Sequence, residues 1–136
     1  MNIVIAGSRD FNDYELLELT ITKWAEEQTE LKQEDITIIS GNARGADKLG
    51  ERFAKEYSLK LKVYPADWNQ YGKSAGYIRN KIMASVSDVA FIFWDGQSKG
   101  TKHMIDLCNQ YPTIELHVLN YKDDLHFIYN NKAPWE

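Results

Sequence analysis

A β-strand, a glycine-containing turn and a helix follow one another between residues 36 and 57, and this unit constrains the fold more than any other feature of the sequence. Ile36–Ile39 is a β-branched apolar run typical of a buried strand, and Lys48–Tyr57 places apolar residues at helical spacing. Between them lies Ser40–Asp47, with the sequence Ser-Gly-Asn-Ala-Arg-Gly-Ala-Asp. A buried strand that turns directly into a helix is typical of a parallel sheet with crossover helices.

The same alternation continues along the chain. Short apolar runs predict strands at Asn2–Ala6, Ile36–Ile39, Leu59–Tyr64, Val89–Trp94 and Ile114–Leu119. Apolar residues at helical spacing predict helices at about Tyr14–Glu27, Lys48–Tyr57, Ala75–Ser85 and Thr101–Gln110. Strands that alternate with helices form βαβ units with right-handed crossovers. We therefore predict an α/β fold in which helices cover both faces of a mostly parallel sheet of about five strands.

The length of the chain and its last residues complete this prediction. At 136 residues the chain is most simply a single domain, residues 1–136, and is large enough to bury a core. Residues 120–136 are less periodic. We expect them to form a C-terminal extension that packs on the body through Leu125, Phe127, Ile128 and Trp135.

The composition of the chain argues against several classes of protein. The net charge of −4 argues against a general nucleic-acid binder, which must neutralise many phosphates. His103, His117 and His126 are scattered, so we predict no metal site. The single Cys108 suits a reducing cytoplasm, and Met1–Ala6 leads directly into a strand and a polar turn. We expect no signal peptide, no membrane span and a cytoplasmic protein.

Polar segments follow four of the predicted strands. They are Gly7–Phe11, Ser40–Asp47, Pro65–Gly76 and Asp95–Thr101. The carboxyl ends of parallel strands meet at one edge of a sheet, and ligands of open α/β folds bind there. The sequence therefore predicts a site of nucleotide size at this edge.

The residue types in these turns are suited to an anion. The first turn of a helix leaves backbone N–H groups unpaired, and Gly41 and Gly45 remove Cβ atoms where a phosphate would approach. The guanidinium groups of Arg9 and Arg44 match phosphate oxygens bidentately, so these are the leading phosphate ligands. The alternative is that the glycines only make a tight connection and the arginines are solvated surface charges.

Several other side chains have more than one interpretation. Arg79 reaches the ligand from the third predicted helix or pairs with Asp67 or Asp88 in a structural network. Asp47 orients Arg44, binds a ribose hydroxyl or caps its helix, and Thr101 donates to the ligand or caps the helix that follows it. The aromatic residues Trp68 and Tyr71 stack on a base or lie in the core.

Two carboxylates are candidates for catalysis. Asp67 and Asp95 follow the third and fourth predicted strands, where each is placed to act as a general base or to contact a metal ion. An aspartate at the end of a strand is also a common turn-forming residue. Whether the protein is an enzyme stays open at this stage.

With these residues in view, the chain from about Met1 to Leu119 resembles the YspA-type branch of the SLOG superfamily, the Rossmann-like group that includes the DprA/Smf and LOG proteins. The matching segments are Gly7–Phe11, Ser40–Asp47, Pro65–Trp68, Gly72–Gly76, Arg79-Asn80 and Ser98–Thr101. Asn42 departs from the pattern, because the family usually has a second glycine there. Asn tolerates left-handed backbone geometry better than most residues, so we expect the turn to survive.

The resemblance implies a Rossmann-like three-layer domain that binds a nucleotide or nucleotide-derived ligand, with no other cofactor identified. Homo-oligomers are plausible in this superfamily. The ligand-binding residues that we predict from the turns and the resemblance together are Gly7, Ser8, Arg9, Ser40, Gly41, Ala43, Arg44, Gly45, Asp47, Arg79, Asn80, Ser98, Gly100 and Thr101.

Two alternatives follow from the related branches. LOG proteins are phosphoribohydrolases that act on nucleoside monophosphates, which makes cleavage of an N-glycosidic or phosphate bond the second hypothesis. Gly100 and Thr101 match the LOG signature, but Met104 stands where LOG proteins have a glutamate. DprA-like proteins bind single-stranded DNA, which is the third hypothesis. The acidic balance of this chain makes extended nucleic acid an unexpected partner.

Overall fold

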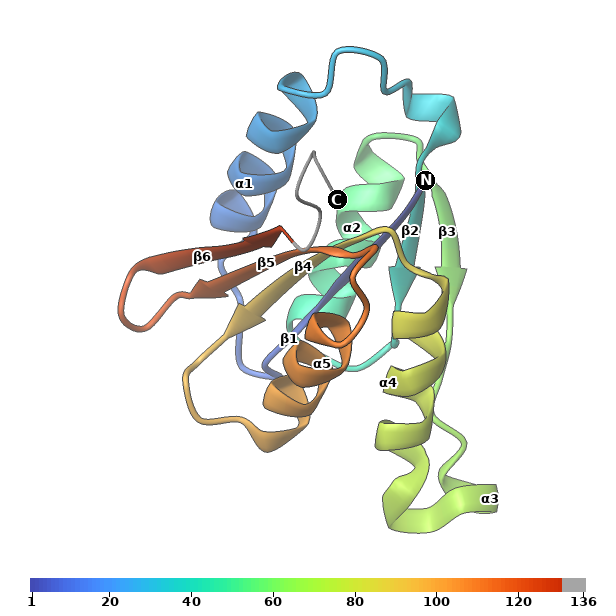
Figure 1. The fold of residues 1–136 in the computed structure, drawn as a ribbon. Coiled ribbons are helices and arrows are strands. Elements are labelled where there is room, and N and C mark those ends of the chain that lie inside the picture. Colours follow the sequence, from blue (N-terminus) through green and yellow to red (C-terminus); the bar gives the residue numbers. More distant parts are fainter. Residues whose placement is uncertain (131–136) are drawn as a thin grey trace.

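The computed structural model describes residues 1–130 as a twisted sheet between two layers of helices (Figure 1). Its strands are β1 (Asn2–Gly7), β2 (Thr37–Ser40), β3 (Lys60–Val63), β4 (Val89–Trp94), β5 (Glu115–Asn120) and β6 (Leu125–Asn130). Its α-helices are α1 (Tyr14–Glu26), α2 (Ala46–Glu56), α3 (Trp68–Tyr71), α4 (Ala75–Val86) and α5 (Lys99–Asn109). Short 3-10 helices lie at Gln33–Asp35 and Gly72–Ser74.

The order of the strands is β3-β2-β1-β4-β5-β6, with β1 to β5 parallel and β6 antiparallel to β5. This arrangement confirms the predicted α/β fold with a mostly parallel, Rossmann-like sheet. From β1 the chain crosses first toward β2 and β3 and later returns to β4 and β5 on the other side. The strand order therefore reverses between β1 and β4, and this switch point is where a ligand site is expected.

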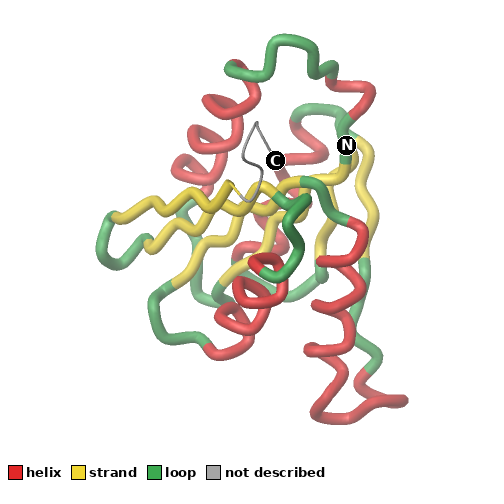
Figure 2. The backbone as a smooth tube through the Cα atoms, viewed as in Figure 1, coloured by secondary structure: helices red, strands yellow, loops and turns green. Residues whose placement is uncertain are grey.

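Each face of the sheet buries its own apolar cluster, and Figure 2 shows the strands in yellow between the helices in red. Alternate residues of β1 point to opposite faces, as strand geometry requires. Ile3 and Ile5 join the cluster that packs under α1 and α2, whereas Val4 and Ala6 join the cluster under α4 and α5. Helices on both faces confirm the predicted three layers.

The structure adds one strand to the predicted set. Residues 125–130 form β6, which pairs with β5 in a hairpin in which Val118 lies opposite Phe127. Leu125, Phe127 and Ile128 leave 46–58% of their surface exposed. The expected packing of this extension is therefore wrong for these side chains, because β6 is held through its pairing with β5. The predicted role of Trp135 lies outside the described residues.

Candidate functional site

An open pocket of about 600 Å³ lies at the carboxyl ends of β1 and β4, at the switch point of the sheet. Its walls come from the turns after β1, β2 and β4 and from α3, α4 and α5. The lining residues are Ala6, Gly7, Ser8, Arg9, Asp10, Ala43, Arg44, Asp47, Trp68, Lys73, Gly76, Tyr77, Arg79, Asn80, Met83, Asp95, Ser98, Gly100, Thr101 and Met104. The pocket has the size of typical small-molecule sites.

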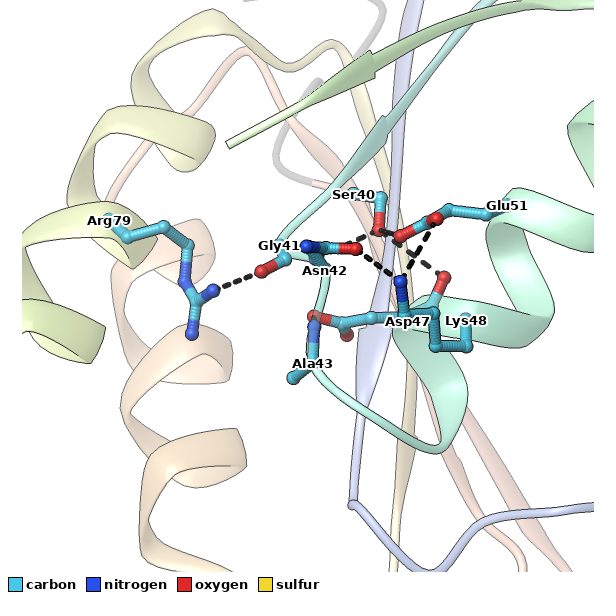
Figure 3. Close-up of polar contacts among 8 residues, drawn as sticks. All are labelled: Ser40, Gly41, Asn42, Ala43, Asp47, Lys48, Glu51 and Arg79. Carbon is cyan, nitrogen blue, oxygen red and sulfur yellow. Dashed lines mark hydrogen bonds and ion pairs between the residues drawn. The ribbon is translucent and has the colours of Figure 1, made fainter. Parts of the chain in front are cut away.

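The turn between β2 and α2 is held by hydrogen bonds within the turn and to the first turns of α2 (Figure 3). The buried hydroxyl of Ser40 donates to Glu51 at 2.8 Å and accepts the backbone N–H of Asn42 at 3.1 Å. Asn42 has a left-handed backbone with φ of 63°, and its side chain accepts a hydrogen bond from Lys48. The prediction that Asn42 tolerates this geometry is confirmed.

Gly41 lies between the guanidinium of Arg79 and the carboxylate of Asp47. A Cβ atom on Gly41 would lie 2.7 Å from an Nη1 atom of Arg79 and 2.7 Å from an Oδ2 atom of Asp47. The guanidinium of Arg79 also donates to the carbonyl oxygen of Gly41 (Figure 3). Arg79 thereby ties α4 to the turn, and no pair of Arg79 with Asp67 or Asp88 forms.

Asp47 is a buried carboxylate in the wall of the pocket, with 4% of its surface exposed. Its Oδ2 atom accepts the backbone N–H of Ala43 at 3.2 Å. Burial raises the pKa of Asp47 to about 6, although the Ala43 N–H and the nearby Arg79 act to lower it and Glu51 acts to raise it. A carboxyl with a pKa of about 6 holds or releases a proton near neutral pH.

The turn between β4 and α5 is organised by Asp95. Its Oδ1 atom accepts the N–H of Gln97 at 2.9 Å and of Ser98 at 2.7 Å, and its own N–H donates to the hydroxyl of Ser8 at 3.1 Å. Burial alone would raise the pKa of Asp95, but hydrogen bonds from Ser98, Gln97 and Ser8 outweigh it and lower the pKa. The helix begins at Lys99, before the predicted start at Thr101, whose hydroxyl bonds Ser98 at 3.1 Å.

Cationic side chains from separate segments line the pocket. Arg9 follows β1, Arg44 precedes α2, and Arg79 lies on α4. Within residues 1–130, the guanidinium groups of Arg9 and Arg44 make no hydrogen bond or ion pair. Burial lowers the pKa of Arg79, Asp47 raises it and Arg9 lowers it. Arg9 and Arg79 therefore repel each other across the site.

Comparison with known proteins decides the family. The model of the YspA, cpYpsA-related SLOG family matches residues 1–71, just over half of the chain. The chain belongs to this SLOG family. It is also 31% identical over 109 residues to the Gene 61 protein of Mycobacterium phage D29, an alignment that covers 74% of this chain and 82% of that protein. No solved structure matches it significantly.

The family match covers only part of the pocket of this SLOG protein. It includes Arg9 and the turn Ser40–Asp47, from which Ala43, Arg44 and Asp47 line the pocket. Arg79 and the turn Asp95–Thr101 lie beyond the matched residues, and the structure places them on the same pocket.

The structure brings most of the predicted ligand-binding residues of this SLOG protein to the pocket. Those that line it are Gly7, Ser8, Arg9, Ala43, Arg44, Asp47, Arg79, Asn80, Ser98, Gly100 and Thr101. Ser40, Gly41 and Gly45 are not among the lining residues and instead shape the turn. Their predicted role came from their place in the motif, which indicates a turn but not which of its atoms face the ligand.

The two candidate catalytic carboxylates differ in position. Asp95 lines the pocket, whereas Asp67 does not, because its carboxylate accepts the N–H of Gln70 at 3.1 Å as the cap of α3. Sequence reasoning assigned no role to Tyr77 or Asp10, which line the pocket. A signal for Tyr77 was its position beside the Gly72–Gly76 segment.

Two further findings concern the described part of the chain. Within residues 1–130, no three His, Cys, Asp or Glu side chains gather so that they could hold a metal ion. No described helix has the length and apolar character that crossing a membrane requires.

Proposed function

We propose that this SLOG protein binds a nucleotide or nucleotide-derived ligand, with the phosphate groups against Arg9, Arg44 and Arg79. The observation that carries the proposal is the convergence of these guanidinium groups on one pocket at the switch point of the sheet. Membership of the SLOG family supports a nucleotide-related ligand.

Electrostatics favours an anion in this position. Arg9 and Arg79 repel each other, and neither Arg9 nor Arg44 has a carboxylate partner within residues 1–130. A bound phosphate relieves this repulsion and accepts charge-assisted hydrogen bonds, which are stronger than those between neutral groups. Among residues 1–130, four cationic side chains and three carboxylates line the pocket, so the site has a small excess of positive charge in a chain whose net charge is −4.

Thermal unfolding against a panel of ligands tests the proposal. The panel is AMP, ATP, NAD, ADP-ribose, cyclic nucleotides and a short single-stranded oligonucleotide. A ligand at a hundredfold its dissociation constant stabilises the folded state by roughly 2.7 kcal/mol. For a domain of this size the melting temperature rises by about 5–15 °C. We expect at least one nucleotide to produce this rise, and Arg44→Ala to abolish it.

Arg52→Ala is the matched control. It removes the same charge from the exposed surface of α2, where Arg52 pairs with Glu56 outside the pocket. Its ligand-induced rise should equal that of the unmodified protein. A rise produced by the oligonucleotide alone, falling steeply with added salt, would instead favour the single-stranded nucleic-acid hypothesis. No rise with any nucleotide contradicts the proposal.

Hydrolysis of the bound ligand is a second candidate, and the observation that favours it is Asp47. A carboxyl with a pKa of about 6 in the pocket wall is suited to general acid–base catalysis. In this reaction water attacks the ribosyl C1′, its proton passes to the Asp47 carboxylate, and the C1′–N bond breaks as the base leaves with a proton from solvent. Met104 supplies no carboxylate at the position of the LOG glutamate, and the side chain is buried.

Product analysis separates binding from hydrolysis. If the second candidate holds, slow release of free base from AMP should be lost in Asp47→Asn while the AMP-induced rise in melting temperature is kept. Asp95→Asn tests a second carboxylate of the pocket, and Asp67→Asn tests a carboxylate outside it. If no product forms after prolonged incubation, the hydrolysis candidate is contradicted and only the proposed binding function stands.

A further inference from the structure

Two half-exposed aromatic side chains lie on the wall of the pocket, and together they are called the aromatic surface. They are Trp68 on α3 and Tyr77 on α4, with 52% and 48% of their surface exposed. Aromatic side chains that stay exposed on a pocket wall are typical of ligand sites, whereas single exposed apolar residues elsewhere are common.

Each ring is held in place by its neighbours. The Cη2 atom of Trp68 lies 3.5 Å from the position that a Cβ atom on Gly76 would take, which is an ordinary van der Waals distance, so the indole lies against the first turn of α4. The ring of Tyr77 packs edge-on against the ring of His103, with centroids 4.5 Å apart and planes at 70°. The ring of Trp68 therefore lies against α4, and the ring of Tyr77 lies against α5.

The aromatic surface adjoins the cationic part of the pocket. Gly76 and Arg79 are one helical turn apart on α4, and a Cβ atom on Gly76 would lie 3.8 Å from an Nη2 atom of Arg79. Trp68 and Arg79 thus approach Gly76 together. The site offers aromatic side chains beside the positive charge of Arg79, which suits a molecule with a planar ring at one end and an anion at the other.

We propose that Trp68 and Tyr77 recognise the base of the ligand by stacking, so that the pocket selects a nucleotide over the corresponding sugar phosphate. The proposal rests on the proposed function, because it assumes that phosphate binds at the arginines. The face of an aromatic side chain attracts any nucleobase, and such stacking is tolerant of which base it is. Selection is therefore for the presence of a base more than for its identity.

Calorimetric titration with AMP and with ribose 5-phosphate tests this inference, because ribose 5-phosphate carries a hydroxyl group at C1′ where AMP carries adenine. The unmodified protein should bind AMP at least tenfold more tightly than ribose 5-phosphate. Trp68→Ala and Tyr77→Ala should each lower the affinity for AMP by about tenfold and leave that for ribose 5-phosphate within about twofold. Trp68→Phe, which keeps an aromatic face, should retain most of the preference.

Tyr71→Ala is the matched control, since Tyr71 is a half-exposed aromatic on the same short helix as Trp68 but does not line the pocket. It should change neither affinity. Equal binding of the two probes, or an equal loss of both in Trp68→Ala, would overturn the stacking role while the phosphate site stands. Failure of both probes to bind the unmodified protein would overturn the proposed function and the stacking role together.

Discussion

At the scale of single residues, the site depends on glycine where two chain segments approach most closely. Gly41 leaves room between Arg79 and Asp47, and Gly45 has a left-handed backbone with φ of 84°. A Cβ atom on Gly45 would lie 2.4 Å from the carbonyl oxygen of Ser8. The two positions therefore tolerate a methyl group differently, because the neighbours of Gly41 are side chains and the neighbours of Gly45 are backbone.

Gly45→Ala should destabilise the fold more than Gly41→Ala. At Gly45 the added methyl group meets fixed backbone atoms and a strained φ, so we expect a loss of roughly 2–4 kcal/mol in the free energy of unfolding. At Gly41 the added methyl group meets the ends of the Arg79 and Asp47 side chains, which can shift, so we expect a loss of about 1 kcal/mol with weaker ligand binding. Urea denaturation of both variants checks this order, and the reverse order would contradict the described turn.

Asp47→Asn should remove a pH dependence of stability. Burial raises the pKa of Asp47 from its ordinary value of 3.8 to about 6 in the folded protein. The folded state therefore holds this proton more tightly, and the stability that it contributes below about pH 4 is lost as the pH rises through about 6. At about pH 7.5 the asparagine variant should be more stable by on the order of 3 kcal/mol, and at about pH 3.5 the two proteins should match.

Denaturation at several pH values makes this comparison. The ionised carboxylate is the form that burial destabilises, so the gain should grow between about pH 4 and about pH 6 and be complete above the folded pKa. A variant that follows the unmodified protein at every pH would show that Asp47 does not titrate in the described surroundings.

At the scale of elements, the helices and β6 are held to the sheet by different interactions. The α1–α2 and α4–α5 layers bury apolar side chains against opposite faces of the sheet. The strand β6 contributes backbone pairing to β5 but exposes most of its large side chains. Burial of apolar surface is the main source of stability in a core, so the two kinds of element should respond differently to the same substitution.

Phe93→Ala and Phe127→Ala compare them directly. Phe93 on β4 is fully buried and stacks on Phe11 with ring centroids 4.7 Å apart, whereas Phe127 on β6 is 46% exposed. The first change should lower the free energy of unfolding by about 3–5 kcal/mol and the second by about 1 kcal/mol or less. Equal losses in thermal or urea denaturation would mean that β6 is buried in solution.

The elements also show how far the sequence could predict this fold. The buried strands and the helices α1, α2 and α4 have clear periodicity, and their predicted positions agree with the structure to within a few residues. The strand β6 shows no such pattern, because side chains on both of its faces are exposed and its place depends on pairing with β5. The helix α3 lies in the polar segment Pro65–Gly76, for which no helix was predicted, although Asp67 was a usable capping signal.

At the scale of the whole molecule, parallel strands bring distant turns to one edge, and this is why the site was predictable in outline. The turns after β1, β2 and β4 meet at the switch point, as the alternation of strands and helices predicts. The side of the pocket formed by α3 and α4 was less predictable, since Tyr77 reaches it through tertiary packing. Which atoms face inward follows from that packing and not from sequence spacing.

The most direct test of the central claim is a map of backbone amide chemical shifts during titration with each nucleotide of the panel. If the pocket is the ligand site, the largest changes should occur together in three segments that are far apart in the sequence, 7–9, 41–47 and 98–101. Arg44→Ala should remove them. Changes confined to residues outside the pocket, or no change with any nucleotide, would contradict the claim that this edge of the sheet binds a nucleotide.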